Sequence, residues 1–288
     1  MRARYPDCDG TVVRDGVEIH YERYGHGSPT ILLLPTWSLV HSRHWKMQVA
    51  YLARHFTVAC FDGRGSGGSG HPPEPAAYTD VQFASDAVAV MDAAGIETAV
   101  LVSVSCGALW ALRLGAEHPD RVLGSVFIAP TAPLVPPLAE RRVQRFGEML
   151  DDPVGWETYN ARYWQTHYPE FVTFFAGRIF TEPHSTKQIE DVIGWALEID
   201  GGTLAAAHLG LECCDAAATR RLAARLACPV LVVHGTDDVV RGYDEGEALA
   251  RSTGGALVTL AGSGHFPHAR DPVRVNMLIK QFADRFRR

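Results

Sequence analysis

Six short apolar runs constrain the fold of this chain more than any other feature. Each has the length of a strand, is rich in Val, Ile and Leu, and carries almost no charge; they occupy residues 31–34, 58–61, 99–104, 125–129, 230–234 and 256–260. Such runs are typical of parallel strands that helices cover on both faces. Helical patterns separate several of them, for example at residues 81–94 and 106–118. The alternation predicts an α/β fold with a doubly wound, mostly parallel sheet.

A different pattern precedes the first of these runs. Residues 11–24, TVVRDGVEIHYERY, alternate apolar and polar side chains on both sides of Asp15-Gly16. This period of two indicates strands with one buried face, and Asp-Gly tolerates the positive φ angles of a type I′ turn. The segment therefore predicts a β-hairpin.

The alternation of strands and helices stops after Pro130. From residue 134 to residue 227 the patterns are helical, and a strand pattern returns only after Cys228-Pro229. We therefore predict that residues 1–133 and 228–288 form the α/β core, and that residues 134–227 form an inserted helical cap, or lid, over the strand ends. This predicted cap is rich in aromatic side chains. We expect most of them to pack the cap and a few to line a pocket.

Composition and charge exclude several classes of function. The chain of 288 residues has a formal net charge of −6 and no cluster of Lys and Arg, which argues against a nucleic-acid or anionic-membrane surface. No run approaches the roughly 18 consecutive apolar residues of a membrane span. The polar N-terminus does not resemble a secretory signal, and the six cysteines, which lack paired spacing, are expected to be free thiols. These features predict a cytoplasmic protein.

The segment LVSVSCGALWAL at residues 101–112 places a serine between an apolar strand and a helix. Ser105 has a small residue two positions before it, Ser103, and another two positions after it, Gly107. This pattern resembles the nucleophile elbow of α/β-hydrolases, in which a sharp strand-to-helix turn holds the nucleophile above the sheet. Ser103 replaces the family's usual glycine and is small enough for the close packing there. The resemblance implies that Ser105 is a catalytic nucleophile.

Two later segments supply the partners that such a serine needs. PVLVVHGTDDVV at residues 229–240 resembles the family's acid loop, which assigns the acid to Asp238, with Asp237 as the alternative. LAGSGHFPHARDP at residues 260–272 resembles the family's histidine loop, which assigns the base to His265, with His268 as the alternative. Serine, acid and histidine occur in the order typical of this fold. In such a triad the imidazole takes the serine proton and the carboxylate orients the imidazole.

An oxyanion hole needs backbone N–H donors beside the nucleophile. The resemblance assigns one donor to Cys106, the residue after the nucleophile, and the other to Trp37, in the loop after the first apolar run. Relatives usually have His-Gly before the second donor, whereas this chain has Pro35-Thr36. Trp37 would also place a large aromatic ring beside the reaction centre.

Two further motifs raise the possibility of phosphate or metal binding. The segment DGRGSGGS at residues 62–69 matches neither a dinucleotide-binding loop nor a Walker loop, and it resembles a structural turn of α/β-hydrolases. HSRH at residues 41–44 and HFPH at residues 265–268 have a spacing that two helical metal ligands could share, but neither has a third ligand pattern nearby. We therefore expect no metal and no cofactor.

A serine nucleophile implies acyl transfer, whereas the family branches that open epoxides or displace halide use aspartate. The leading hypothesis is a serine hydrolase of the esterase type that cleaves a small or medium-sized apolar or aromatic carboxylic ester through an acyl-enzyme. The candidate substrate-binding residues are Trp37, Trp164, Phe175 and Trp195.

The same triad is compatible with other activities. C–C bond hydrolysis, acyl transfer and cofactor-free lyase or haloperoxidase-like chemistry all remain open. A hypothesis from another class is a catalytically silent receptor that kept the fold and the pocket. The expected partners are a small-molecule substrate and, in a homodimer, a second copy of this chain, with no nucleic acid and no membrane.

Overall fold

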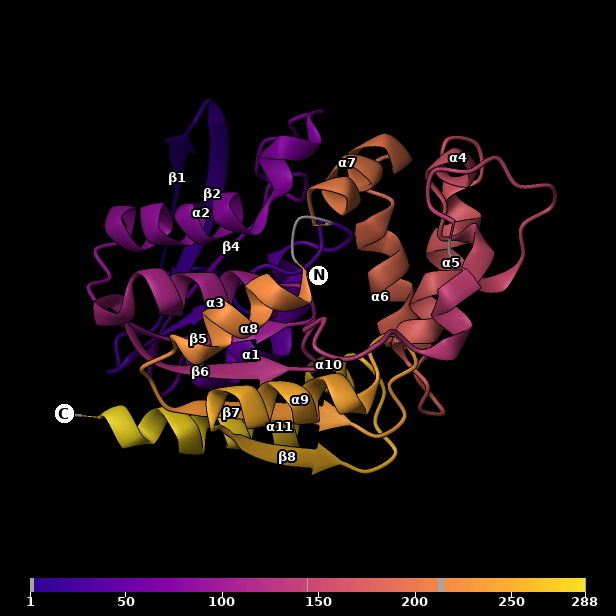
Figure 1. Ribbon diagram of the computed structural model, residues 1–288. Helices are drawn as coiled ribbons and strands as arrows, with labels where there is room; N and C mark the ends of the chain where they lie inside the picture. The colour runs from indigo at the N-terminus through magenta and orange to yellow at the C-terminus, as the bar shows by residue number, and fades with distance from the viewer. Residues whose placement is uncertain (1–2, 144, 212–214, 288) are drawn as a thin grey trace.

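The computed structural model describes residues 3–143, 145–211 and 215–287. Its centre is one eight-stranded sheet in the order β1-β2-β4-β3-β5-β6-β7-β8 (Figure 1). The strands are β1 (Cys8–Arg14), β2 (Val17–Tyr24), β3 (Thr30–Leu33), β4 (Thr57–Phe61), β5 (Ala99–Val104), β6 (Val122–Ile128), β7 (Val230–Gly235) and β8 (Ala256–Leu260). All pairings from β4 to β8 are parallel. The predicted doubly wound, mostly parallel sheet is confirmed.

The antiparallel edge of the sheet is the predicted hairpin. β1 and β2 pair with Arg14 opposite Val17, and the turn residues Asp15 and Gly16 have φ angles of 51° and 77°. Positive angles at both positions are those of a type I′ turn. In the centre of the sheet every residue of β5 and β7 is buried. Burial on both faces explains why these strands have continuous apolar sequences.

Helices cover both faces of the sheet (Figure 1). One layer consists of four helices that pack in a row: α2 (Asp80–Ala93), α3 (Gly107–Glu117), α8 (Ala216–Ala224) and α9 (Tyr243–Thr253). The opposite layer consists of α1 (Lys46–Leu52), α10 (Pro267–Arg270) and α11 (Pro272–Ala283). Short 3₁₀ turns add η1 (Ser42–Trp45), η2 (Pro75–Tyr78), η3 (Pro119–Arg121) and η6 (Asp284–Phe286).

The segment between β6 and β7 forms a helical cap beyond the carboxyl ends of the parallel strands (Figure 1). Its elements are η4 (Ala139–Val143), η5 (Gly155–Thr158), α4 (Ala161–Trp164), α5 (Tyr168–Ile179), α6 (Thr186–Ala196) and α7 (Gly201–Leu211). Aromatic rings fill its interior: Phe171 packs against Trp164 and Phe175, with ring centroids 4.5 and 5.5 Å away. The cap therefore has an aromatic core of its own.

Helix α8 belongs with the α/β core, although the sequence predicted a cap that continued to residue 227. α8 packs against α3 and α9, and its residues Leu222 and Ala223 are buried there. Leu226, just after α8, covers Gly115 of α3 so closely that a Cβ at this glycine would lie 2.5 Å from the leucine side chain. Helical periodicity identifies the face that a helix buries, but it does not identify the element that covers this face.

The lengths and the apolar character of the helices can be compared with the predicted absence of a membrane span. Among the described residues, no helix combines the length and the apolar character that crossing a bilayer requires.

Candidate active site

Ser105 lies in the sharp turn between β5 and α3. Its φ angle is 53°, a left-handed value that residues with a side chain seldom adopt. Its N–H donates to the carbonyl of Ile128 at 3.0 Å, which fixes the turn against β6. A Cβ at Gly107 would lie 2.6 Å from the carbonyl oxygen of Pro35 and 3.3 Å from the Cβ of Ser103. This close approach requires the glycine at position 107 and a small residue at position 103.

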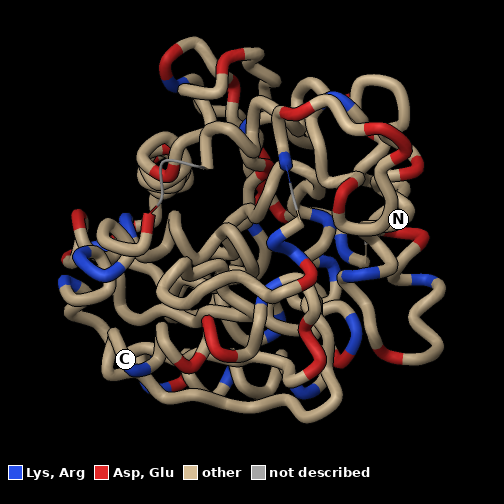
Figure 2. The backbone as a smooth tube through the Cα atoms, turned by 45° about the vertical axis from the view of Figure 1, so that its right-hand side comes forward, with Lys and Arg blue, Asp and Glu red and all other residues tan. Residues whose placement is uncertain are grey.

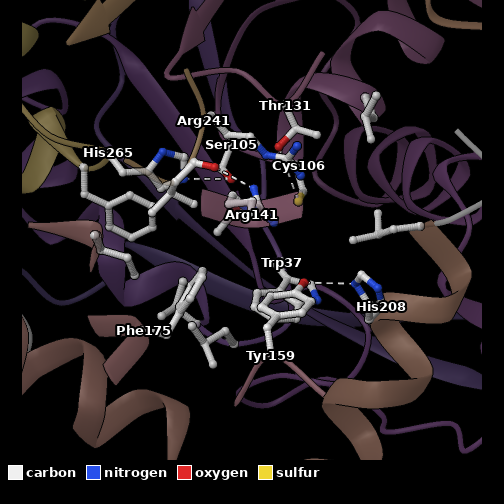
Figure 3. A pocket seen from close by; sticks show the side chains of 18 of the residues that line it. Trp37, Ser105, Cys106, Thr131, Arg141, Tyr159, Phe175, His208, Arg241 and His265 are labelled. Atoms are coloured by element: carbon white, nitrogen blue, oxygen red, sulfur yellow. Dashed lines mark hydrogen bonds between the residues drawn. The ribbon is translucent and has the colours of Figure 1, made fainter. Parts of the chain in front are cut away.

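Three side chains that are distant in the sequence meet at the carboxyl ends of the parallel strands. Ser105 Oγ lies 3.0 Å from Nε2 of His265 (Figure 3), and His265 Nδ1 lies 2.7 Å from Oδ2 of Asp238. All three residues are buried. With its proton on Nδ1, His265 donates to the carboxylate and accepts from the serine hydroxyl at Nε2. This is the geometry of a nucleophile, a general base and an orienting acid.

Asp238 is held by a dense set of donors. Its Oδ1 accepts the backbone N–H groups of Val240 and Arg241, both at 2.8 Å, and its Oδ2 lies 3.0 Å from His234 Nε2 as well as close to His265. Burial raises the pKa of this carboxyl, but the charge of His265 and hydrogen bonds from both histidines outweigh it, so the pKa stays well below its usual value. The carboxylate is therefore ionised at neutral pH.

The alternative residues lie outside this chain of contacts. Asp237 is exposed, and its Oδ1 accepts a hydrogen bond from the hydroxyl of Thr236. His268 is fully buried, with its Nε2 3.1 Å from Nδ1 of His44. Because neither side chain contacts Ser105 or His265 by a hydrogen bond, Asp238 and His265 remain the better candidates.

The cap holds the loop that carries His265. The backbone N–H of His265 donates to the carbonyl of Ile179 at 2.9 Å. Glu182 Oε1 accepts the N–H of Gly264 at 2.8 Å and the hydroxyl of Ser263 at 3.0 Å. Thus the candidate base belongs to the core, while residues at the end of α5 and just after it fix its position.

Both predicted oxyanion donors border the same space as Ser105. Trp37 and Cys106 line the cavity there. Among the described residues, neither of their backbone N–H groups donates a turn or loop hydrogen bond to a backbone carbonyl. The Pro35 carbonyl, by contrast, accepts from Trp110 Nε1 at 2.9 Å. That contact anchors the loop with Pro35-Thr36 to α3, the elbow helix. Trp37 and Cys106 therefore remain the candidates for an oxyanion hole.

A cavity of about 160 Å³ lies over Ser105 beneath the cap (Figure 3). Of the candidate substrate-binding residues, Trp37 and Phe175 line it, and the two rings lie 5.6 Å apart edge to face. Tyr159, which the sequence did not single out, stacks on Trp37 at 5.5 Å and also lines the cavity.

Trp164 and Trp195 are not part of this lining, which corrects their predicted role. Trp164 packs behind Trp37 and donates its Nε1 hydrogen to the carbonyl of Thr158 at 2.9 Å. Trp195 lines a separate cavity of about 220 Å³ next to Lys46. The sequence shows that the predicted cap is rich in aromatic residues, but which rings face the cavity depends on helix orientation.

Comparison with known proteins identifies the family of this chain. A family model described as "alpha/beta hydrolase fold" matches residues 29–272, which is most of the chain. The chain belongs to the α/β-hydrolase family. The prediction of an enzyme of the hydrolase type is confirmed at this level.

Relatives and solved structures extend over nearly the whole chain. It is 24% identical to 3-oxoadipate enol-lactonase 2 of Acinetobacter baylyi over 281 residues, which cover 96% of this chain and 97% of that protein. The enol-lactonase structure from Burkholderia xenovorans has a TM-score of 0.78 and 23% identity, with coverage of 95% and 99%. The structure of a thermophilic esterase from Thermogutta terrifontis has a TM-score of 0.78 and 25% identity, with coverage of 96% and 97%.

The glycine-rich turn of this α/β-hydrolase has structural contacts only. Asp62 accepts the N–H groups of Ser42 at 2.9 Å and Gly68 at 2.8 Å. Arg64 is buried and pairs with Asp86 through bonds of 2.6 and 2.9 Å. The turn ties two loops together, as the resemblance predicted.

The histidine pairs considered as metal ligands form no metal-binding group in the described residues. His44 and His268 contact each other, and no set of three or more His, Cys, Asp and Glu side chains is placed to hold a metal within the described ranges. Burial keeps both rings neutral: it lowers the pKa of His268 to about 3 and the pKa of His44 well below its usual value.

The sequence analysis missed three polar residues around the site. His234 is the penultimate residue of β7 and contacts Asp238, whereas Arg141 and Arg241 line the cavity. His234 lies within the motif that identified Asp238 and Arg241 directly follows it, so a polar residue near a strand end was an available signal. Arg141 had no such signal, because nothing in Glu140-Arg141-Arg142 indicates which side chain points inward.

Proposed function

We propose that this α/β-hydrolase cleaves a small carboxylic ester or lactone through an acyl-enzyme on Ser105. The observation that supports this proposal is the continuous contact from Ser105 Oγ through His265 to Asp238 at the base of a cavity. A serine hydroxyl becomes a good nucleophile only when a neighbouring base takes its proton, and here His265 is within hydrogen-bonding distance.

The proposed reaction has two stages. In the first, Ser105 Oγ attacks the carbonyl carbon while His265 Nε2 takes the hydroxyl proton, and the N–H groups of Trp37 and Cys106 stabilise the negative oxygen. The tetrahedral intermediate then breaks its bond to the alcohol oxygen, which takes the proton from His265. In the second stage a water molecule, deprotonated by His265, attacks the carbonyl carbon of the acyl-enzyme. The bond from this carbon to Ser105 Oγ then breaks, Oγ takes the proton back from His265, and the carboxylic acid is released.

The cavity wall and the relatives guide the choice of substrate. Trp37, Tyr159 and Phe175 present aromatic surface, which favours an apolar or aromatic group on the substrate. The cavity volume of about 160 Å³ favours a small molecule. Of the three related proteins described above, two are named enol-lactonases and one an esterase, and ring opening of a lactone uses the same two stages.

A labelling experiment tests this proposal. Wild type should react with a fluorophosphonate probe and hydrolyse p-nitrophenyl acetate, and Ser105→Ala should lose both properties. Ser85→Ala is the matched control, because Ser85 lies on α2 and its hydroxyl donates only to the carbonyl of Val81, at 2.8 Å. If Ser105→Ala were labelled and turned over ester like wild type, the proposal would be wrong. Absence of both activities in wild type would favour the receptor hypothesis.

A further inference from the structure

Two arginine side chains lie in the wall of the cavity above Ser105. Arg141 comes from η4 of the cap and Arg241 from the loop after β7 (Figure 3). Both arginines line the same cavity as Cys106, the residue after the nucleophile. An otherwise aromatic cavity therefore has a cationic region next to the expected reaction centre.

The two arginines differ in how their charge is balanced. Arg241 pairs with the buried carboxylate of Glu245 at 3.5 Å. Arg141 is only 9% exposed, yet no carboxylate forms an ion pair with it in residues 3–143, 145–211 and 215–287. Its Nη1 donates to the carbonyl of Val240 at 2.5 Å, and its buried Nε has no hydrogen-bond partner. The charge of Glu245 also acts on Arg141, so within the described residues one carboxylate balances two arginines and Arg141 has no ion pair of its own.

Neither His208 nor Asp238 supplies the negative charge that Arg141 lacks. His208 contacts the hydroxyl of Tyr159 at 2.9 Å, and burial together with the two arginines lowers the pKa of His208 to about 3. His208 is therefore neutral at physiological pH. Arg141 stays protonated, since burial and the nearby Arg241 lower its pKa only to about 10. Asp238 cannot serve as the counter-charge, because its oxygens already accept from two histidines and two backbone N–H groups.

A buried cation without an ion pair is costly, and a carboxylate that binds it recovers a strong, charge-assisted hydrogen bond. We propose that the ester or lactone cleaved by this enzyme carries a carboxylate, which Arg141 and Arg241 bind beside Ser105. This inference rests on the proposed function and adds a substrate class: an ester with an apolar body and one anionic end. The aromatic rings would contact the body, and the arginines would select against neutral esters.

Matched ester pairs test the proposal. Monomethyl glutarate and methyl pentanoate differ by a carboxylate on the acyl side, whereas 3-acetoxybenzoate and phenyl acetate differ by one on the alcohol side. For at least one pair, wild type should have a higher kcat/KM for the anionic member. In Arg141→Gln the anionic-to-neutral ratio of kcat/KM should fall roughly 10- to 100-fold, because a hydrogen bond to a charged group is lost. The loss should appear mainly in KM.

Arg142→Gln is the matched control, because Arg142 lies on the same turn, is exposed, and donates to the carbonyl of Pro137 at 3.1 Å. This variant should keep the wild-type ratio. A second measurement does not depend on any variant: glutarate should inhibit wild-type turnover of p-nitrophenyl acetate competitively, and pentanamide should inhibit it far less.

The outcomes separate this inference from the proposed function. If wild type labels at Ser105 and hydrolyses neutral esters, but prefers no anionic ester and is not inhibited by glutarate, the carboxylate proposal is wrong and the proposed function stands. If Arg141→Gln loses stability yet keeps the wild-type preference, Arg141 is a structural residue and the proposal is again wrong. If wild type neither labels nor hydrolyses any ester, both proposals fail.

Discussion

The strand ends below the cavity and the cap above it are built in different ways. Ser105, Asp238 and His265 each follow a core strand, and each is fixed by contacts to the backbone or to one another. The cap covers them with residues from separate helices and turns, such as Phe175 of α5 and Arg141 of η4. Figure 2 shows Lys, Arg, Asp and Glu spread along much of the chain, and among the arginines of the described residues only Arg64 and Arg141 are buried. We therefore expect the core to determine the chemistry, and the cap together with Trp37 and Arg241 of the core to determine the substrate.

The largest effects should come from the strand ends. Asp238→Asn should lower kcat by about 10⁴-fold, because the imidazole loses its orientation, and His265→Gln should lower it by about 10⁶-fold. These losses should be similar for every ester tested. Asp237→Asn and His268→Gln are the matched neighbours and should keep kcat near the wild-type value. Steady-state kinetics with p-nitrophenyl acetate measures all four. A large loss in a neighbour variant, with Asp238→Asn active, would reassign the acid or the base.

A smaller effect on kcat should come from the contact that joins the two regions. Glu182→Ala removes the acceptor for Gly264 and Ser263, so the His265 loop loses its anchor on the cap. Because misplacing a catalytic group by about 1 Å can cost roughly 100-fold, we expect kcat to fall 10- to 100-fold. Glu190→Ala, an exposed change on α6, should have no such effect. An unchanged kcat in Glu182→Ala would show that the core positions His265 alone.

A still smaller effect should separate two adjacent cap residues. Phe175 lines the cavity, whereas Phe174 packs edge to face on Trp156, with its ring centroid 5.4 Å away, and does not line the cavity. Phe175→Ala removes aromatic surface from the substrate site, so KM for phenyl acetate should rise about 10-fold. Phe174→Ala should leave this KM near the wild-type value even if it lowers the melting temperature. Equal KM values in the two variants would contradict the assignment of Phe175 to the substrate site.

The last prediction concerns stability in acid and not turnover, and here core and cap should behave alike. Burial lowers the pKa of His268 in the core and of His208 in the cap to about 3. Both rings are neutral when folded, so below pH 6.5, near the pKa of an unfolded histidine, the unfolded chain binds more protons. The free energy of unfolding should therefore decrease as the pH falls from about 6.5 to about 3, by at most about 1.4 kcal/mol per pH unit for each histidine.

Urea unfolding at several pH values measures this decrease. His268→Gln should have a shallower dependence on pH than wild type, whereas His71→Gln, a change at an exposed position, should follow wild type. Equal slopes in wild type and His268→Gln would mean that this buried ring does not titrate as proposed.

The sequence by itself determined the sheet and the residues at its strand ends. Continuous apolar runs predicted the strands because strands covered on both faces exclude charge, and the motifs around Ser105, Asp238 and His265 are short enough to read along the chain. Their alternatives, Asp237 and His268, could not be ranked by sequence alone; burial and hydrogen-bond contacts separate them in the structure.

Only the tertiary structure decided the cavity wall. It placed α8 on the core, turned Trp164 and Trp195 away from Ser105, and brought Arg141 and Arg241 into the wall. Periodicity shows that a helix has a buried face, but the direction of that face depends on how each helix packs against elements distant in the sequence. The contacts between His234 and Asp238 and between Glu182 and the His265 loop likewise arise only when the chain is folded.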